Sequence, residues 1–186
     1  MSHKGKSTLK GYFVAGSVPT AANFEDLVDS THNGQGTYQL VSDATDTTID
    51  SSETAGGIIH LQGTGGTTSD EQLLKLPEAS AGNIGLTYKL ILGSNVTNLR
   101  IGPDGTTTKL SGSLTVNSPT GSIWEPAPLG ATHISLSAGA AGKGGVSGSY
   151  IEFFYNSATG VTVFGTVLNS HATATGADLY GTGDIG

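Results

Sequence analysis

Histidines are the side chains best suited to metal binding and to proton transfer near neutral pH, and here they are spread along the whole chain. They are His3, His32, His60, His133 and His171. No two of them stand at the short spacings that place a pair of imidazoles on one face of an element. We therefore predict no metal site, cofactor site or histidine-based catalytic group. The alternative is that folding, or a threefold axis between subunits, brings some of these histidines together to bind a metal.

The second group of possible ligands is an acidic stretch between residues 43 and 53. A calcium loop needs oxygen ligands at alternate positions followed by a glycine, and this stretch lacks that order. We interpret it as a solvated loop, with a cation site as the alternative. The carboxylates in question are Asp43, Asp46, Asp50 and Glu53.

Two glycine-rich sequences approach known catalytic or binding motifs without matching them. In a phosphate-binding loop the lysine is followed by serine or threonine and a helix, but here Gly144 follows Lys143 and no helix pattern follows. We therefore interpret residues 139–145 as a surface loop. The nearby Gly145-Val-Ser-Gly sequence lacks the spacing of a serine nucleophile elbow.

Carboxylates and aromatic rings could together process or bind sugars. Glu125 and Glu152 are the candidate pair for glycoside cleavage, but both are expected at solvent-facing strand positions. We expect most of the aromatic side chains in the core or in subunit contacts rather than stacked on sugars. The aromatic candidates are Tyr38, Tyr88, Trp124, Tyr150, Tyr155 and Tyr180.

The elements that would position these residues are short and β-rich. Glycine accounts for 29 of the 186 residues, apolar residues for 35% and charged residues for only 12%. Short apolar blocks, separated by Gly and Pro at intervals of about ten residues, predict an antiparallel β-sandwich or barrel of the jelly-roll kind. The small apolar content favours an oligomer, which would bury further area. Predicted strands cover 38–41, 47–49, 57–61, 71–76, 87–92, 96–101, 107–110, 113–116, 122–124, 133–136, 148–155 and 160–167.

The chain divides into three parts on composition. Residues 1–37 are predicted to be a docking arm, residues 38–170 a β domain with a possible subdivision near 117, and residues 171–186 a flexible tail. The chain has no cysteine and no run of about 18 apolar residues, so disulfides and a membrane-spanning helix are not expected. The first residues also lack the apolar segment of a secretory signal.

The predicted arm is basic and contains one helix signal. Thr20 is a good N-cap, and the apolar residues Phe24, Leu27 and Val28 follow at the spacing of one helical face, which predicts a helix over about 20–30. Three lysines, Lys4, Lys6 and Lys10, precede it, whereas the whole chain carries a net charge of −7. A basic arm suits an acidic surface, with a frayed terminus as the alternative, and an acidic body disfavours nucleic acid.

Two segments resemble structural proteins of tailed phages. The first runs from Leu9-Lys-Gly-Tyr-Phe to Pro19-Thr-Ala-Ala-Asn-Phe-Glu-Asp-Leu-Val-Asp-Ser30 and is similar to the N-terminal segment of head-fibre, decoration and tail-appendage proteins. The second, Leu74-Lys-Leu-Pro-Glu-Ala-Ser-Ala-Gly and its continuation to Gly105, resembles a module of phage particle proteins. The resemblance implies a homotrimeric β protein that attaches to the virion through its N-terminal part, and it brings no catalytic residues.

We therefore expect a structural virion protein, not an enzyme, that decorates or cements the phage capsid as an oligomer. It would be made in the host cytoplasm and reside on the capsid surface, with the major capsid protein and copies of itself as partners. The alternative is a tail-fibre, tail-appendage or receptor-binding protein whose loops near 117–147 bind host-surface glycans; a glycan-processing enzyme is the least favoured reading. The predicted anchoring residues are Lys4, Lys6, Lys10, Phe13, Phe24, Leu27 and Val28.

Overall fold

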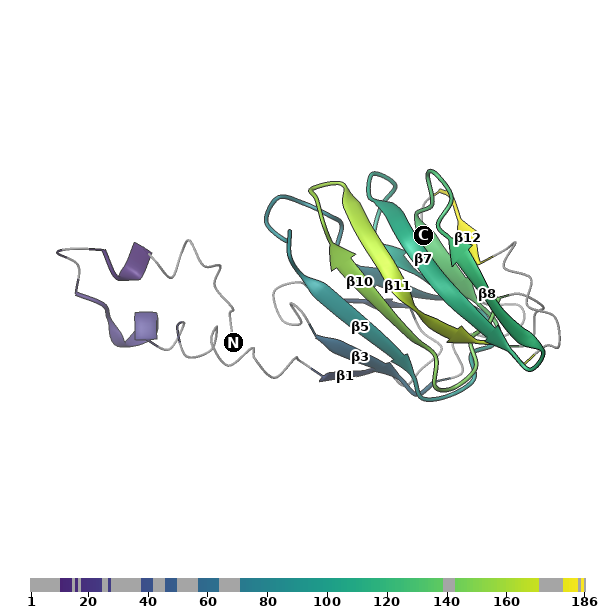
Figure 1. The fold of residues 1–186 in the computed structure, drawn as a ribbon. Helices are drawn as coiled ribbons and strands as arrows, with labels where there is room; N and C mark the ends of the chain where they lie inside the picture. The colour runs from purple at the N-terminus through teal and green to yellow at the C-terminus, as the bar shows by residue number, and fades with distance from the viewer. Residues whose placement is uncertain are drawn as a thin grey trace.

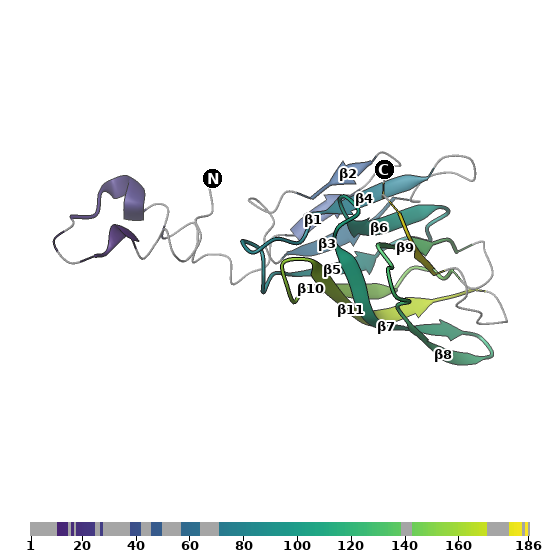
Figure 2. The same ribbon diagram turned by 90° about the horizontal axis from the view of Figure 1, so that it is seen from above.

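Two β-sheets pack face to face and enclose one hydrophobic core (Figures 1 and 2). The computed structural model describes residues 11–14, 16, 18–24, 27, 38–41, 46–49, 57–63, 71–138, 143–170, 179–183 and 185. The arrangement confirms the predicted mainly-β sandwich.

The two sheets differ in width. The wider sheet has the order β1 (Tyr38–Val41), β3 (Ile58–Leu61), β5 (Thr87–Leu92), β10 (Tyr150–Tyr155), β11 (Gly160–Leu168), β7 (Lys109–Ser118) and β8 (Gly121–Pro126). The narrower sheet has the order β12 (Tyr180–Gly181), β9 (His133–Leu136), β6 (Leu99–Pro103), β4 (Gln72–Leu76) and β2 (Thr47–Thr48).

From β1 to β7 the chain changes sheet at every step. As a result β1, β3 and β5 stack in parallel in the wide sheet, and β2, β4 and β6 stack in parallel in the narrow one. The sheets are therefore mixed, and the expectation of antiparallel pairing is corrected for this half. The reason lies in the connections: segments such as 77–86 and 93–98 cross the gap of about 10 Å between sheets instead of reversing within one.

In the C-terminal half, β10 and β11 form an antiparallel hairpin over the predicted strands 148–155 and 160–167. Its register pairs Phe153 with Val163 and Tyr155 with Val161, and all four side chains are buried. Strand β7 runs unbroken through Gly112, where two separate strands were predicted. Gly112 has φ +92°, and a Cβ there would lie 2.3 Å from the carbonyl oxygen of the opposing residue in β11, so only glycine fits this close approach.

Alternating side chains from both sheets fill the core. Near its centre the Tyr88 and Tyr155 rings meet edge to face, 5.8 Å between centroids, and the Tyr155 hydroxyl donates to the Pro77 carbonyl at 2.6 Å. The largest completely buried side chains also include Phe153, Ile49, Ile59, Leu61, Leu74, Leu76, Leu90, Leu92, Leu99 and Ile101.

The predicted flexible tail is corrected over its described part. Tyr180 and Gly181 form β12 and pair with Ile134 and His133 of β9. Leu179 and Ile185, on either side of β12, are fully buried, and this apolar burial holds the segment on the sandwich. Residues 171–178 lie outside the described residues.

Candidate functional site

A capped helical turn at residues 20–24 is the centre of the predicted anchoring segment. The Thr20 N–H donates to Asn23 Oδ1 at 2.8 Å, and the Asn23 N–H donates back to Thr20 Oγ1 at 3.3 Å. The Phe24 N–H closes the turn on the Thr20 carbonyl at 3.2 Å. These bonds confirm Thr20 as an N-cap. The predicted helix over about 20–30 is not confirmed, since described helical residues are limited to 21–24 and Leu27 in that stretch.

The turn brings together two of the predicted anchoring residues. The Phe13 and Phe24 rings lie edge to face with centroids 5.8 Å apart, and they remain 45% and 52% exposed. Leu27 is partly buried, whereas Lys4, Lys6, Lys10 and Val28 lie outside the described residues. Both ribbon views place these turns beside the sandwich rather than in its core (Figures 1 and 2). The result is an apolar pair presented to solvent, which suits docking rather than chemistry.

A second exposed apolar region, which the sequence did not predict, covers the outer face of the wide sheet. We call Trp124, Tyr150, Phe154 and Phe164 the aromatic face. Trp124 is 68% exposed, Phe164 42% and Phe154 39%, while Tyr150 is partly buried. They come from the neighbouring strands β8, β10 and β11, with β7 between β8 and β11 (Figure 1).

Hydrogen bonds and charges hold the aromatic face in place. The indole N–H of Trp124 donates to Ser113 Oγ at 2.6 Å, and Ser113 is in turn the register partner of Phe164. Lys89 Nζ lies 2.8 Å from the carboxylate of Glu152 and 5.0 Å from the Tyr150 ring centroid. The hydrogen bond and charge of Glu152 raise the pKa of Lys89 above its usual value.

The two candidate carboxylates for glycoside cleavage are not brought together. Glu125 pairs with the buried Leu114, and Glu152 pairs with the exposed Phe164. Residues paired across strands share a face, so these carboxylates lie on opposite faces of the sheet. They therefore cannot flank one glycosidic bond.

The other chemical candidates are likewise separate. Among the described residues, no group of three or more His, Asp or Glu side chains could hold a metal ion. Asp46 accepts a hydrogen bond from the Leu73 N–H at 2.9 Å, which gives it a structural role. Asp43, Asp50, Glu53 and residues 139–142 lie outside the described part of the chain.

His133 is buried beneath β12 and cannot act on a solvent-borne substrate. Its Nδ1 lies 3.1 Å from Thr132 Oγ1, and its ring packs against the backbone of Gly181. Burial, followed by the nearby charges of Arg100 and Lys143, lowers the pKa of His133 to about 4.

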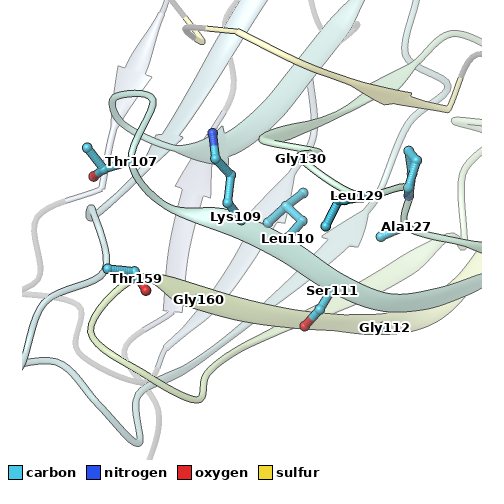
Figure 3. A pocket seen from close by; sticks show the side chains of 11 residues that line it. Thr107, Lys109, Leu110, Ser111, Gly112, Ala127, Leu129, Gly130, Thr159 and Gly160 are labelled. Carbon is cyan, nitrogen blue, oxygen red and sulfur yellow. The ribbon is translucent and has the colours of Figure 1, made fainter.

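A groove of about 710 Å³ opens where the starts of β7 and β11 meet the 127–130 loop (Figure 3). Lys109 is the charged residue in its lining, and its ammonium donates to the Thr106 carbonyl at 2.5 Å. The rest of the lining consists of small residues, Pro128, the buried Leu110 and the fully exposed Leu129. The lining includes neither a carboxylate nor a histidine, so this groove offers no acid–base pair.

No described helix has the length and apolar character that a membrane crossing requires. Comparisons of the sequence with family models and curated proteins, and of the fold with solved structures, found no significant match.

Proposed function

We propose that this chain is a structural protein of a phage particle that decorates or cements the capsid through its N-terminal segment. The observation that carries the proposal is the solvent-exposed Phe13–Phe24 pair on a capped turn. The resemblance of residues 9–30 to phage attachment segments supports the same role. The sandwich would act mechanically, as a stable body that the anchor holds on the particle.

The energy available from this anchor is modest for one copy. Fully burying a phenylalanine side chain contributes about 1.5–3 kcal/mol, and each ring here is roughly half exposed. Docking the pair would therefore contribute about 1.5–3 kcal/mol, before any attraction from Lys4, Lys6 and Lys10. Several copies held together would stay bound to the particle far more strongly than one copy. Once the first anchor is bound, each further anchor binds at a high effective concentration.

The direct test is retention of the full chain on the particles that carry it. We expect the double variant F13S/F24S to co-sediment with particles about tenfold more weakly or worse. The matched control is Ile84→Ser, an equally exposed apolar residue on the body at 52%, which should keep wild-type retention. Undiminished retention of F13S/F24S, with a folded sandwich by circular dichroism, would refute the anchoring role.

A second candidate function is recognition of host-surface glycans, favoured by the 68% exposure of Trp124. An exposed indole fixed by a hydrogen bond provides a surface on which a sugar ring can stack. Binding of the full chain to neutral polysaccharide, retained by F13S/F24S and lost by Trp124→Ala, would favour this function over decoration. Location in a particle reconstruction would separate the two directly.

A further inference from the structure

We propose that the aromatic face is a self-association surface on which a second copy of this chain packs, whether or not the protein sits on a capsid. Three large aromatic side chains are exposed on the outer face of the wide sheet, which they share with the Lys89–Glu152 ion pair. Phe154 and Phe164 lie on the adjacent strands β10 and β11, and Trp124 lies further along on β8. Exposed aromatic rings gathered on one face of a sheet mark interaction sites, and interface cores are enriched in aromatic residues.

The narrow sheet provides an internal comparison. Its outer face carries the ion pairs Arg100–Glu71 at 2.8 Å and Lys75–Asp104 at 3.9 Å, which is the usual chemistry of a solvated surface. Among the described residues, none of the exposed large apolar side chains lies in a strand of this sheet, whereas the wide sheet has three exposed aromatic rings beside its one ion pair. Both sheets belong to the same chain and solvent, so the difference between their outer faces points to different surroundings. The wide sheet is the one built to be covered.

Charge favours a second copy as the occupant. Four residues form one row across β3, β5, β10 and β11, namely Ile58, Lys89, Glu152 and Phe164. A two-fold axis parallel to the strands, between β5 and β10, would place Lys89 opposite Glu152 of the second copy. The same operation places Ile58 opposite Phe164 of the second copy, so the row is complementary to itself, while β8 with Trp124 extends past the partner's β1 at the rim of the contact.

The overall charge leads to the same occupant. The chain carries a net charge of −7, so two copies repel one another over most of their surface. Lys89 and Glu152, on the two strands that flank the proposed axis, neutralise each other beside the aromatic face. Two copies can therefore approach there without a net repulsion, and opposite charges then meet across the contact.

The available area suits a reversible complex. Strands are spaced by about 4.8 Å and rise about 3.4 Å per residue, so a face six strands wide and six residues long covers roughly 600 Å². Packing two such faces would bury about 1,200 Å², the lower end of the range for specific interfaces. We expect dissociation in the micromolar range, which a concentration series can detect.

Sedimentation velocity on the purified full chain tests this directly. Wild type should sediment as a dimer at high concentration and dissociate on dilution. Phe164→Ser should weaken dimerisation about tenfold or more, since a ring leaves the centre of the contact. The control Leu129→Ser, at a fully exposed leucine away from the face, should keep the wild-type behaviour.

A charge exchange keeps the test decisive where Phe164→Ser disturbs the fold. Glu152→Lys places two cations together within a copy and between copies, and should leave monomers. The double variant K89E/E152K restores opposite charges at both places and should restore the dimer. A monomeric wild type, a trimer, which needs two different surfaces per copy, or no rescue would overturn the proposal. Particles are absent from this assay, so its failure leaves the anchoring proposal untouched.

Discussion

Acidification should loosen the attachment of strand β12, because a neutral histidine lies beneath it. His133 is only 5% exposed, and a Cβ at Gly181 would lie 2.0 Å from its Nε2, so the ring and the strand backbone are in direct contact. The charges nearest to this ring are those of Arg100 and Lys143, both cations. A proton taken up by His133 would therefore be buried beside like charges.

The size of the effect follows from the two pKa values of His133. The unfolded chain protonates this histidine as the pH falls through 6.5, whereas the folded chain keeps it neutral down to about 4. Stability is therefore complete above about pH 7 and is lost as the pH falls between these values. The expected loss from His133 alone is about 2 kcal/mol by pH 5 and about 3 kcal/mol by pH 4.

Urea unfolding at a series of pH values would measure this loss. The chain has 15 carboxylates that also titrate at low pH, so the informative quantity is the difference between wild type and His133→Gln. We expect the variant to be less stable at pH 7 and to lose about 2 kcal/mol less than wild type between pH 7 and pH 5. Ile134→Val, in the same strand, should cost about 1 kcal/mol at every pH and keep the wild-type slope.

Equal pH slopes for wild type and His133→Gln would refute this reasoning. That result would mean that the folded chain accommodates a charged imidazole under β12 at little cost. The pH slopes of wild type and His133→Gln could also differ while the hydrogen-exchange protection of the β12 amides stays constant with pH. That result would contradict the inference that acidification loosens β12.

Three further predictions concern the body and are checked by the free energy of unfolding. Leu90→Ala should cost about 2–5 kcal/mol, whereas Leu129→Ala, at a fully exposed site, should change it by less than about 0.5 kcal/mol. Gly112→Ala should cost more than about 2 kcal/mol because φ is +92° and a Cβ would meet a β11 carbonyl. Gly82→Ala should be nearly neutral, since a Cβ there would make only an ordinary contact with Ser80 Oγ at 3.8 Å. Tyr155→Phe should cost about 1–3 kcal/mol by leaving the partly buried Pro77 carbonyl without its donor. A neutral outcome for Leu90→Ala, Gly112→Ala or Tyr155→Phe would contradict the packing described.

Individual strands could be predicted from sequence because hydrophobic alternation is local. The predicted bounds of Thr87–Leu92 and His133–Leu136 are confirmed to the residue. The partners of a strand are not local, so the parallel stacking of the first six strands could not be predicted. The segment at Leu179 was missed because two isolated apolar residues among small polar ones give no strand pattern.

The aromatic face escaped prediction for a related reason. In β10 the neighbours Phe153 and Phe154 point to opposite sides of the sheet, one fully buried and one 39% exposed. When a strand has apolar side chains on both faces, the sequence pattern does not indicate which face packs in the core of its own domain. The hydrogen bond that fixes Trp124 depends on the register of β7 and β8, which only the folded chain defines.

The two proposed surfaces are connected through β1. This strand starts at Tyr38, 14 residues after Phe24, and forms the edge of the sheet that carries the aromatic face. Fourteen residues span at most about 50 Å, so each anchor stays within that distance of its own sheet edge. Two copies joined through their wide sheets would therefore hold their two Phe13–Phe24 pairs within a limited distance of each other.

Binding of the first pair to a particle would raise the local concentration of the second pair at its surface. Loss of self-association should therefore weaken retention on the particle even where the anchor is intact. Retention of Phe164→Ser at the wild-type level, with its dimer abolished, would show that the two surfaces work independently.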